Sequence, residues 1–235
     1  MSTAKLIPRA QTPVLESGDR LSRAEFERRY RALPHKQAEL IEGVVYMASP
    51  VRAQKHAQPH SNVIGWLVTY AAATPGVMVC DNATVRLDWE NEPQPDALLR
   101  LDEACGGQSR ISEDDYVEGA PELIVEVASS SASYDLHDKL RAYRRNGVKE
   151  YLVWLVSERA LRWYRLEEGE YRPQAADAAG VLSSAVFPGL RLDPEALLAG
   201  EMQRVLAAVQ AGLGSAAHQA FVQQLQALSN SLAEF

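Results

Sequence analysis

Residues Glu122-Leu123-Ile124-Val125-Glu126-Val127-Ala128 are the stretch that decides the fold. Apolar residues on both faces of this run predict a central β-strand that is covered on both sides. Glu126 is the exception, because alternating side chains place it on one face with Ile124 and Ala128. A carboxylate is almost never fully buried without a partner or a metal ion. We therefore expect a positively charged group opposite Glu126.

The segment after this strand offers such a group on a predicted helix. Ser133 or Asp135 can cap the helix, and Lys139 lies on the flank of its apolar stripe. That stripe consists of Leu136, Leu140 and Tyr143. A helix that packs this stripe on the strand would bring one ammonium close to the Glu126 carboxylate.

A second acid, Asp96, follows Pro95 at the start of another apolar run, residues 97 to 101. Two acids and a lysine that converge at the edge of a sheet can bind a divalent cation and activate a water molecule. The sequence therefore indicates Asp96, Glu126 and Lys139 as candidate catalytic residues.

These residues, in this order, resemble the PD-(D/E)XK nuclease superfamily, and more closely its restriction-endonuclease-like Uma-two family. The resemblance covers roughly residues 20 to 199. In the superfamily a lysine follows the glutamate by two positions, but Ala128 stands there and the charge has moved to Lys139. The matching motifs are Glu39-Leu40-Ile41-Glu42-Gly43, Pro95-Asp96, Val125-Glu126-Val127-Ala128-Ser129, Lys139 and Gly147-Val148-Lys149-Glu150-Tyr151.

The displaced lysine is physically reasonable. Residues two apart on a strand lie on one face, ~6.6 Å apart, so a lysine at position 128 would flank the same ion as Glu126. A lysine early in a helix that packs back on the strand can place its ammonium in the same volume.

The resemblance implies an α/β fold with a restriction-endonuclease-like core, in which helices flank a mixed central β-sheet. It implies a metal-dependent endonuclease that hydrolyses phosphodiester bonds in DNA. Asp96, Glu126 and the Val127 carbonyl would hold Mg²⁺ or Mn²⁺, and Glu39 would assist. Lys139 would orient or help to deprotonate the attacking water and stabilise charge in the transition state.

Two further positions are candidate substrate contacts. His56 and His60 precede a predicted helix over residues 61 to 73, where a histidine can contact phosphate or transfer a proton. His56 is the favoured one, although histidines at such positions are more often surface or capping residues. Arg144 belongs to the densest basic cluster, for which a solvated helix face is the alternative interpretation. This cluster comprises Lys139, Arg141, Arg144, Arg145 and Lys149.

The chain divides into three parts. We expect a flexible tail over residues 1–20, a nuclease-like domain over residues 21–199 and a C-terminal helical extension over residues 200–235. An apolar stripe in the extension is too short to form a coiled coil alone, so it either docks on the core or pairs with another chain as a homodimer. The stripe consists of Phe221, Leu225, Leu228 and Leu232.

Local signals predict the remaining elements. Residues 39–48 predict one strand with a bend at Gly43, and residues 50–59 predict a loop. Residues 84–89 predict a strand that forms a hairpin with residues 95–101. The strands at 122–128 and 151–156, joined by a helix at 135–146, are expected to be parallel neighbours.

Composition places the protein among ordinary globular chains. It has 235 residues, of which 46% are hydrophobic and 23% charged. A net charge of −7 argues against a surface coated in basic patches, but a metal site itself concentrates acids. We expect no membrane span and a cytoplasmic location, with Cys80 and Cys105 as reduced thiols.

Two other functions are alternatives to a nuclease. The acidic charge and Ala128 are compatible with a catalytically inactive binding or scaffold protein that keeps the nuclease fold. A serine hydrolase built on Ser129-Ser130-Ser131 and His137 is the weaker alternative, because no Gly-x-Ser-x-Gly elbow surrounds the serines.

Overall fold

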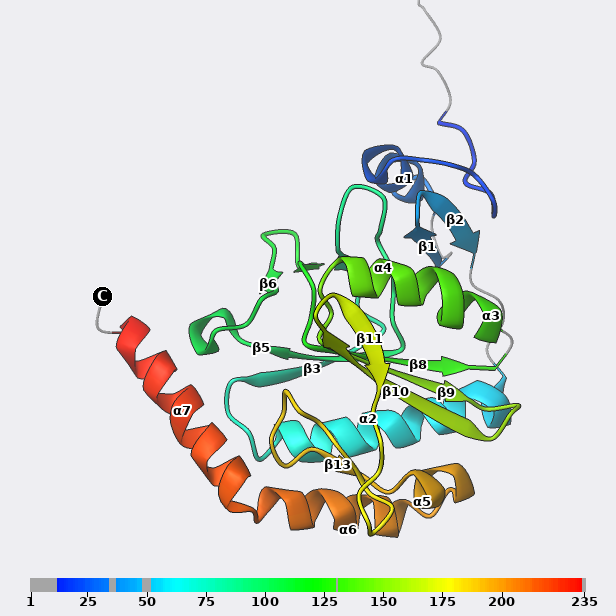
Figure 1. The fold of residues 1–235 in the computed structure, drawn as a ribbon. Helices are drawn as coiled ribbons and strands as arrows, with labels where there is room; N and C mark the ends of the chain where they lie inside the picture. The colour runs from blue at the N-terminus through cyan, green and yellow to red at the C-terminus, as the bar shows by residue number, and fades with distance from the viewer. Residues whose placement is uncertain (1–11, 34–36, 48–51, 130, 234–235) are drawn as a thin grey trace, which may run out of the picture.

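A six-stranded mixed sheet forms the centre of the molecule in a computed structural model that describes residues 12–33, 37–47, 52–129 and 131–233 (Figure 1). The strand order is β11-β10-β9-β8-β5-β3, in which β8 and β9 are parallel and the other neighbours are antiparallel. This arrangement confirms the predicted fold class. The strands are β3 (Val77–Asp81), β5 (Ala97–Leu101), β8 (Leu123–Ala128), β9 (Glu150–Leu155), β10 (Ala160–Glu167) and β11 (Glu170–Pro173).

Strand β8 is buried on both faces, as its apolar pattern predicts. Leu123, Val125 and Val127 belong to the core beneath α2 (Gln58–Ala71), whereas Ile124 and Ala128 belong to the core on the opposite face. A helical segment covers that second face (Figure 1). It consists of α3 (Ala132–Tyr134), the π-helical turn η3 (Asp135–Lys139) and α4 (Leu140–Arg145).

The connection from β8 to β9 agrees with the predicted strand, helix, strand order. The helical segment ends at Asn146, and Gly147 follows with a φ of 83°, which is the conformation of a glycine helix stop. The two strands then pair in parallel from Leu123 with Glu150 to Ala128 with Leu155. Glu126 and Lys139 therefore lie on two elements that pack directly on one another.

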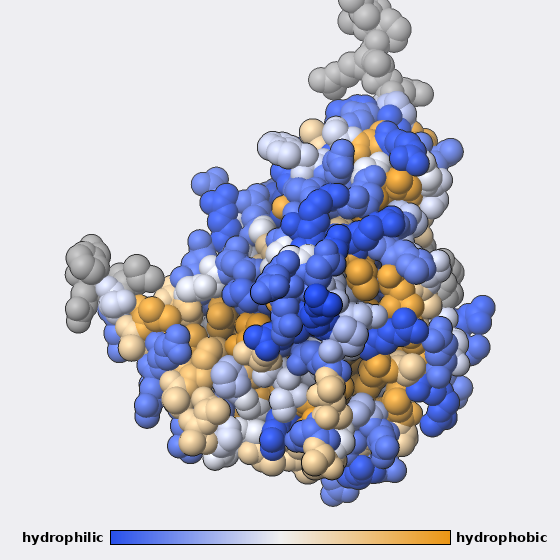
Figure 2. Space-filling view, in the orientation of Figure 1, coloured by the Kyte–Doolittle hydropathy of each residue, from blue (hydrophilic) through white to orange (hydrophobic). Residues whose placement is uncertain are grey.

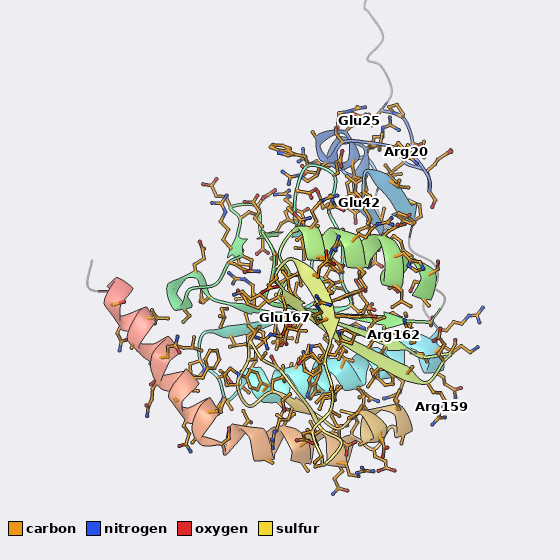
Figure 3. All side chains as sticks on the ribbon, viewed as in Figure 1. Arg20, Glu25, Glu42, Arg159, Arg162 and Glu167 are labelled. Atoms are coloured by element: carbon orange, nitrogen blue, oxygen red, sulfur yellow. The ribbon has the colours of Figure 1, made fainter. Side chains whose placement is uncertain are left out.

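The N-terminal part differs from the single strand expected over residues 39–48, and that prediction is wrong. The structure has a hairpin of β1 (Ala38–Ile41) and β2 (Val44–Met47), which packs with α1 (Arg23–Tyr30). Glu42 and Gly43 both have positive φ angles, 51° and 71°, as a tight two-residue hairpin turn requires. The Glu42 carboxylate, labelled in Figure 3, reaches Arg145 of the helical segment at 2.9 Å.

Residues 12–20 belong to the expected tail, and the structure places them against this hairpin. Leu15 is 2% exposed, and the Gly18 amide donates to the Val45 carbonyl at 2.8 Å. The main-chain carbonyl of Asp19 accepts from the Val45 amide at 2.9 Å, so this stretch runs along β2. Residues 1–11 of the expected tail lie outside the described residues.

The expected hairpin between residues 84–89 and 95–101 is also wrong. Strand β4 spans only Val85–Arg86 and joins a small separate sheet with β7 (Val117–Glu118) and β6 (Arg110–Ile111). Strand β5 pairs instead with β3 and β8, because its residues are buried on both faces and need a central position. The remaining short elements are η2 (Glu103–Cys105), β12 (Leu182–Ser183) and β13 (Arg191–Leu192).

The loop expected over residues 50–59 is largely helical. A π-helical turn, η1 (Ala53–Ala57), leads directly into α2, whose first turn contains Pro59. Pro59 has no amide hydrogen to donate within this run, and the π-helical turn directly before it departs from the regular α-helical hydrogen-bond pattern. Because the helix starts earlier than expected, His56 and His60 lie on one helical run, and both contact residues at the ends of β5 and β8.

The hairpin of β10 and β11 lies at one edge of the sheet. Charged side chains such as Arg162 and Glu167 project from β10 (Figure 3). Charged residues near a sheet edge discourage pairing with other chains. Strand β3 forms the opposite edge.

Three helices follow the sheet: α5 (Pro194–Ala199), α6 (Met202–Leu213) and α7 (Ala216–Ala233). Val205 and Val209 of α6 are buried in the core shared with α2. Helix α7 leaves at 66° to α6, and its Leu225 is buried, whereas Leu228 is 39% exposed. Figure 2 shows exposed apolar residues along these helices and hydrophilic side chains over α4.

Among the described residues, no single helix has both the length and the apolar composition needed to cross a membrane. The bent pair formed by α6 and α7 meets those two criteria together.

Candidate active site

A cavity of about 750 Å³ opens between β1, η1, η3 and the adjoining ends of β5 and β8. All of the residues predicted to carry catalysis line it: Glu39, Asp96, Glu126 and Lys139. His56 and the Val127 main chain line it as well. The structure thus brings together five segments of the chain, from β1 to η3.

Glu126 is almost completely buried, with 3% of its surface exposed. Its Oε1 accepts hydrogen bonds from Lys139 Nζ at 2.9 Å and from the Tyr143 hydroxyl at 2.8 Å. Burial raises the pKa of Glu126 well above its ordinary value, Lys139 lowers it, and the neighbouring carboxylates raise it further. Lys139 is the single ammonium in contact with Glu126, and it therefore offsets only part of the cost of burying this negative charge.

Lys139 is equally buried and faces three carboxylates. Its Nζ lies 2.8 Å from Glu39, 2.9 Å from Glu126 and 3.9 Å from Asp135. Burial alone would lower the pKa of Lys139, but these carboxylates hold it well above its ordinary value. The three carboxylates therefore favour the ammonium form of Lys139.

Glu39 reaches the cavity from the β1–β2 hairpin. Its Oε1 lies 2.8 Å from Lys139 Nζ and accepts from the main-chain amide of Gln94 at 2.7 Å. Strand β1 pairs with β2 across the turn that the strand prediction missed, and Leu40, next to Glu39, exchanges main-chain hydrogen bonds with Glu92. Glu39 is therefore a second carboxylate in contact with Lys139, in addition to Glu126.

Asp96 stands immediately before β5. Its Oδ2 accepts from the Val127 amide at 2.6 Å, and its Oδ1 lies 3.1 Å from His56 Nε2. Burial would raise the pKa of Asp96, but the hydrogen bonds from His56 and Val127 lower it below its ordinary value. The Asp96 amide lies 3.5 Å from Glu126 Oε2, so the two acids occupy neighbouring positions on β5 and β8.

Both histidines that precede the predicted helix meet Asp96. His56 Nδ1 lies 3.0 Å from the Val127 carbonyl oxygen, and its Nε2 faces the Asp96 carboxylate. His60 Nε2 lies 2.8 Å from the Asp96 carbonyl oxygen and 3.0 Å from Asp81 Oδ1. One ligand atom from each of His56, His60 and Asp96 lies within 4.8 Å of the other two. The hydrogen bond to Asp96 is the main reason that the pKa of His56 is raised.

Sequence reasoning missed two residues of the site, although a signal for both was present. Asp135 and Tyr143 stand four residues before and four residues after Lys139. Residues four apart share a helix face, so both side chains point the same way as Lys139. Tyr143 donates to Glu126, and the pKa of Asp135, raised chiefly by its burial, is about 6.

Arg144 does not share this location. It forms an ion pair with Glu170 of β11 and is not among the residues that line the cavity. Its placement gives no support to the expected substrate contact.

The structure gives no support to a serine hydrolase either. Ser131 Oγ donates to Asp135 at 2.5 Å, and His137 is exposed.

Comparison with known proteins gives a family and a fold. The model of the Uma2 family, described as "Putative restriction endonuclease", matches residues 23–195. The crystal structure of a putative nuclease belonging to DUF820 from Anabaena variabilis ATCC 29413 is similar, with a TM-score of 0.53 and 12% sequence identity. That match covers 77% of this chain and 97% of the other. No curated protein sequence matches the chain.

Proposed function

Because the chain belongs to the Uma2 family, we propose that it is a metal-dependent endonuclease that hydrolyses phosphodiester bonds in DNA. The observation that carries this proposal is the meeting of Asp96, Glu126, the Val127 main chain and Lys139 in one cavity. Acids on two neighbouring strands, with an ammonium beside them, are the arrangement that the chemistry requires.

The donor groups suit a divalent cation. Glu39, Glu126 and Asp135 surround Lys139, and Asp96 adds another carboxylate, so negative charge exceeds positive charge in a buried volume. Mg²⁺ and Mn²⁺ prefer carboxylate and carbonyl oxygens. Asp96, Glu126 and the Val127 carbonyl would hold the ion, and Glu39 would assist. When bound, the ion supplies Lewis-acid stabilisation of the phosphoryl group and eases deprotonation of the attacking water.

Lys139 has a role that follows from its contacts. An ammonium held by Glu39 and Glu126 has no lone pair with which to accept a proton. It can instead donate a hydrogen bond that orients the attacking water, and its charge stabilises the transition state as negative charge builds on the phosphoryl oxygens. Of the two roles expected for Lys139, orientation is therefore favoured over deprotonation.

A second candidate is a nuclease-fold binding or scaffold protein without activity. One observation favours it: Glu126 Oε1 already accepts hydrogen bonds from both Lys139 and Tyr143, which stabilise the carboxylate without any ion. Such a protein would bind nucleic acid without cutting it.

The variant Asp96→Asn tests the proposal. The asparagine oxygen can still accept from the Val127 amide, so the fold should persist while Mg²⁺ and Mn²⁺ binding falls and cleavage of DNA stops. The matched control is Asp102→Asn, at the exposed residue that follows the other end of β5. Calorimetry with each metal, and cleavage of duplex DNA, single-stranded DNA and RNA, provide the readouts. Full activity of Asp96→Asn would end the assignment, and a parent protein that neither cleaves nucleic acid nor binds metal in a way that depends on Asp96 and Glu126 would favour the scaffold.

A homodimer through the C-terminal helices is part of the proposal, because cutting both strands of a duplex requires two active sites. The exposed Leu228 on α7 is the residue to change. Light scattering should show a dimer for the parent protein and a monomer for Leu228→Glu. A monomeric parent would remove this part of the proposal.

A further inference from the structure

We propose that His56 and His60 are metal ligands that act with Asp96, so that the centre prefers Mn²⁺ or a later first-row divalent ion to Mg²⁺. This inference rests on the proposed function, because it concerns the same ion. It changes the chemical class of the site from an all-oxygen centre to a mixed nitrogen and oxygen centre.

One helical run carries both histidines and places their rings close to each other and to Asp96. His56 belongs to η1 and His60 to the first turn of α2, four residues later, so that both rings extend from the same side of the run. Their ring centroids are 5.8 Å apart, and the ligand atoms of His56, His60 and Asp96 all lie within 4.8 Å of one another. Two ligand atoms that share an ion with bonds of ~2.1 Å are at most ~4.2 Å apart. A small rotation of side chains is enough to reach that spacing.

The hydrogen bond between His56 and Val127 prepares His56 for coordination. The Val127 carbonyl can only accept, so His56 Nδ1 must donate, and the second nitrogen, which faces the Asp96 carboxylate, is the one that would coordinate an ion. This is the orientation that metal-binding histidines usually have, with the other ring N–H held by a carbonyl or carboxylate. A carbonyl oxygen has two lone pairs, so Val127 can orient His56 and still contact an ion.

The contact between His56 and Asp96 is where an ion would bind. His56 Nε2 lies 3.1 Å from Asp96 Oδ1, and a divalent ion would take the place of the proton that these two atoms share. His60 Nε2 lies 2.8 Å from the Asp96 carbonyl oxygen and 3.0 Å from Asp81 Oδ1, so it donates a hydrogen bond there, and coordination through this nitrogen would move its proton to Nδ1. The spacing of ligand atoms from His56, His60 and Asp96, all within 4.8 Å of one another, points to a cation at this position.

The choice of metal follows from the ligand types. Mg²⁺ binds oxygen almost exclusively and keeps several water molecules, whereas imidazole suits transition metals. Affinity for a given nitrogen and oxygen site rises from Mn²⁺ through Fe²⁺ and Co²⁺. We therefore expect Co²⁺ to bind more tightly than Mn²⁺, and Mn²⁺ more tightly than Mg²⁺.

Nitrogen coordination can be observed without any measurement of activity. The full-length protein is titrated with MnCl₂, CoCl₂ and MgCl₂ by calorimetry, and pulsed electron paramagnetic resonance of the Mn²⁺ form detects coupling to histidine nitrogen. The variants are His56→Gln and His60→Gln. The matched control is His137→Gln, which makes the same change at an exposed position of η3. Asp96→Asn removes the oxygen ligand that both proposals share.

The inference expects nitrogen coupling in the parent protein and in His137→Gln, and a weaker signal in each of the other histidine variants. Their Kd for Mn²⁺ should rise about tenfold or more, while the Kd for Mg²⁺ changes little. Absence of nitrogen coupling, or an effect confined to one histidine, would overturn the three-residue site. If Asp96→Asn alone loses metal, the oxygen centre stands and this inference fails. If Asp96→Asn also binds normally, the proposed function fails with it.

Discussion

Lys139 Nζ lies 2.9 Å from Glu126 Oε1, and both side chains are almost completely buried. The two residues are 13 positions apart, one on β8 and one on the helical segment that covers it. In the superfamily that the sequence resembles, the lysine stands on the strand itself. Here the helix supplies the ammonium that contacts Glu126, and Ala128 stands at the strand position two residues after it.

Replacing Lys139 by Met should remove activity and destabilise the protein. Glu126 and Glu39 would lose their ammonium partner, and an unpaired buried charge costs about 3–5 kcal/mol. Adding Glu126→Gln should recover part of that loss without recovering activity. Urea denaturation measures the stability of each variant. If Lys139→Met alone were as stable as the parent, the buried ion pair would not stabilise the fold.

Replacing Tyr143 by Phe should weaken the site without abolishing it. The Tyr143 hydroxyl donates to Glu126 at 2.8 Å, so its loss should cost about 1–2 kcal/mol of stability. Metal affinity should fall about tenfold, because residues that hold a ligand affect affinity to this degree. Tyr164→Phe on β10 is the matched control. Equal behaviour of the two variants in calorimetry would show that the hydroxyl plays no part.

Glu92 should make stability depend on pH. Burial, with Glu27 close by, raises the pKa of Glu92 to about 8, whereas an unfolded chain has a value near 4.5. The folded protein therefore binds the extra proton, and this stabilisation is complete below pH 4.5 and lost as the pH rises towards 8.

Glu92→Gln should keep the neutral form at every pH. The difference between its free energy of unfolding and that of the parent should grow as the pH rises from 4.5 to 8, reaching roughly 4 kcal/mol in favour of the variant at the upper end. Glu90→Gln changes an exposed neighbour in the same way and serves as control. Parallel stability curves for Glu92→Gln and the parent would refute the raised pKa.

Two glycine substitutions should have opposite effects. A Cβ on Gly212 of α6 would lie 2.0 Å from the Gly189 carbonyl oxygen, so Gly212→Ala must force the helix away from that turn. A cost of about 1–3 kcal/mol is expected. A Cβ on Gly65 of α2 would meet nothing within 4 Å, so Gly65→Ala should stabilise by about 0.5–1 kcal/mol. Thermal unfolding compares the two, and a stabilising Gly212→Ala would disprove the close packing of α6.

The parts of the fold that sequence could predict are those with strong local patterns. The continuous apolar run of β8 predicted a central strand, and Asn146-Gly147 predicted the end of the helix before β9. The partners of β5 could not be predicted in this way. They depend on contacts with residues 77–81 and 123–125, which no local turn signal reports. The hairpin turn at Glu42 and Gly43 could not be predicted, because a residue other than glycine, such as Glu42, rarely adopts a positive φ.

The candidate site was predictable in its acids and in its lysine, because the order of motifs carried that information. The role of His56 and His60 depends on where η1 begins, and a helix start is the least regular part of a helix. Asp135 and Tyr143 could have been found from their spacing to Lys139. That Arg144 pairs with Glu170, away from the cavity, depends on the position of β11, which only the folded chain provides.

The cavity draws its walls from the β1–β2 hairpin, the η1 turn, two sheet strands and the helical segment after them. These pieces span residues 38 to 139, and the sheet that holds them also includes β9, which begins at Glu150. A polypeptide still leaving the ribosome therefore has no working centre until residues beyond Lys139 have emerged and docked. For a protein proposed to cut DNA, this delay would protect the DNA of the cell that makes it, because cleavage could begin only after the domain has folded.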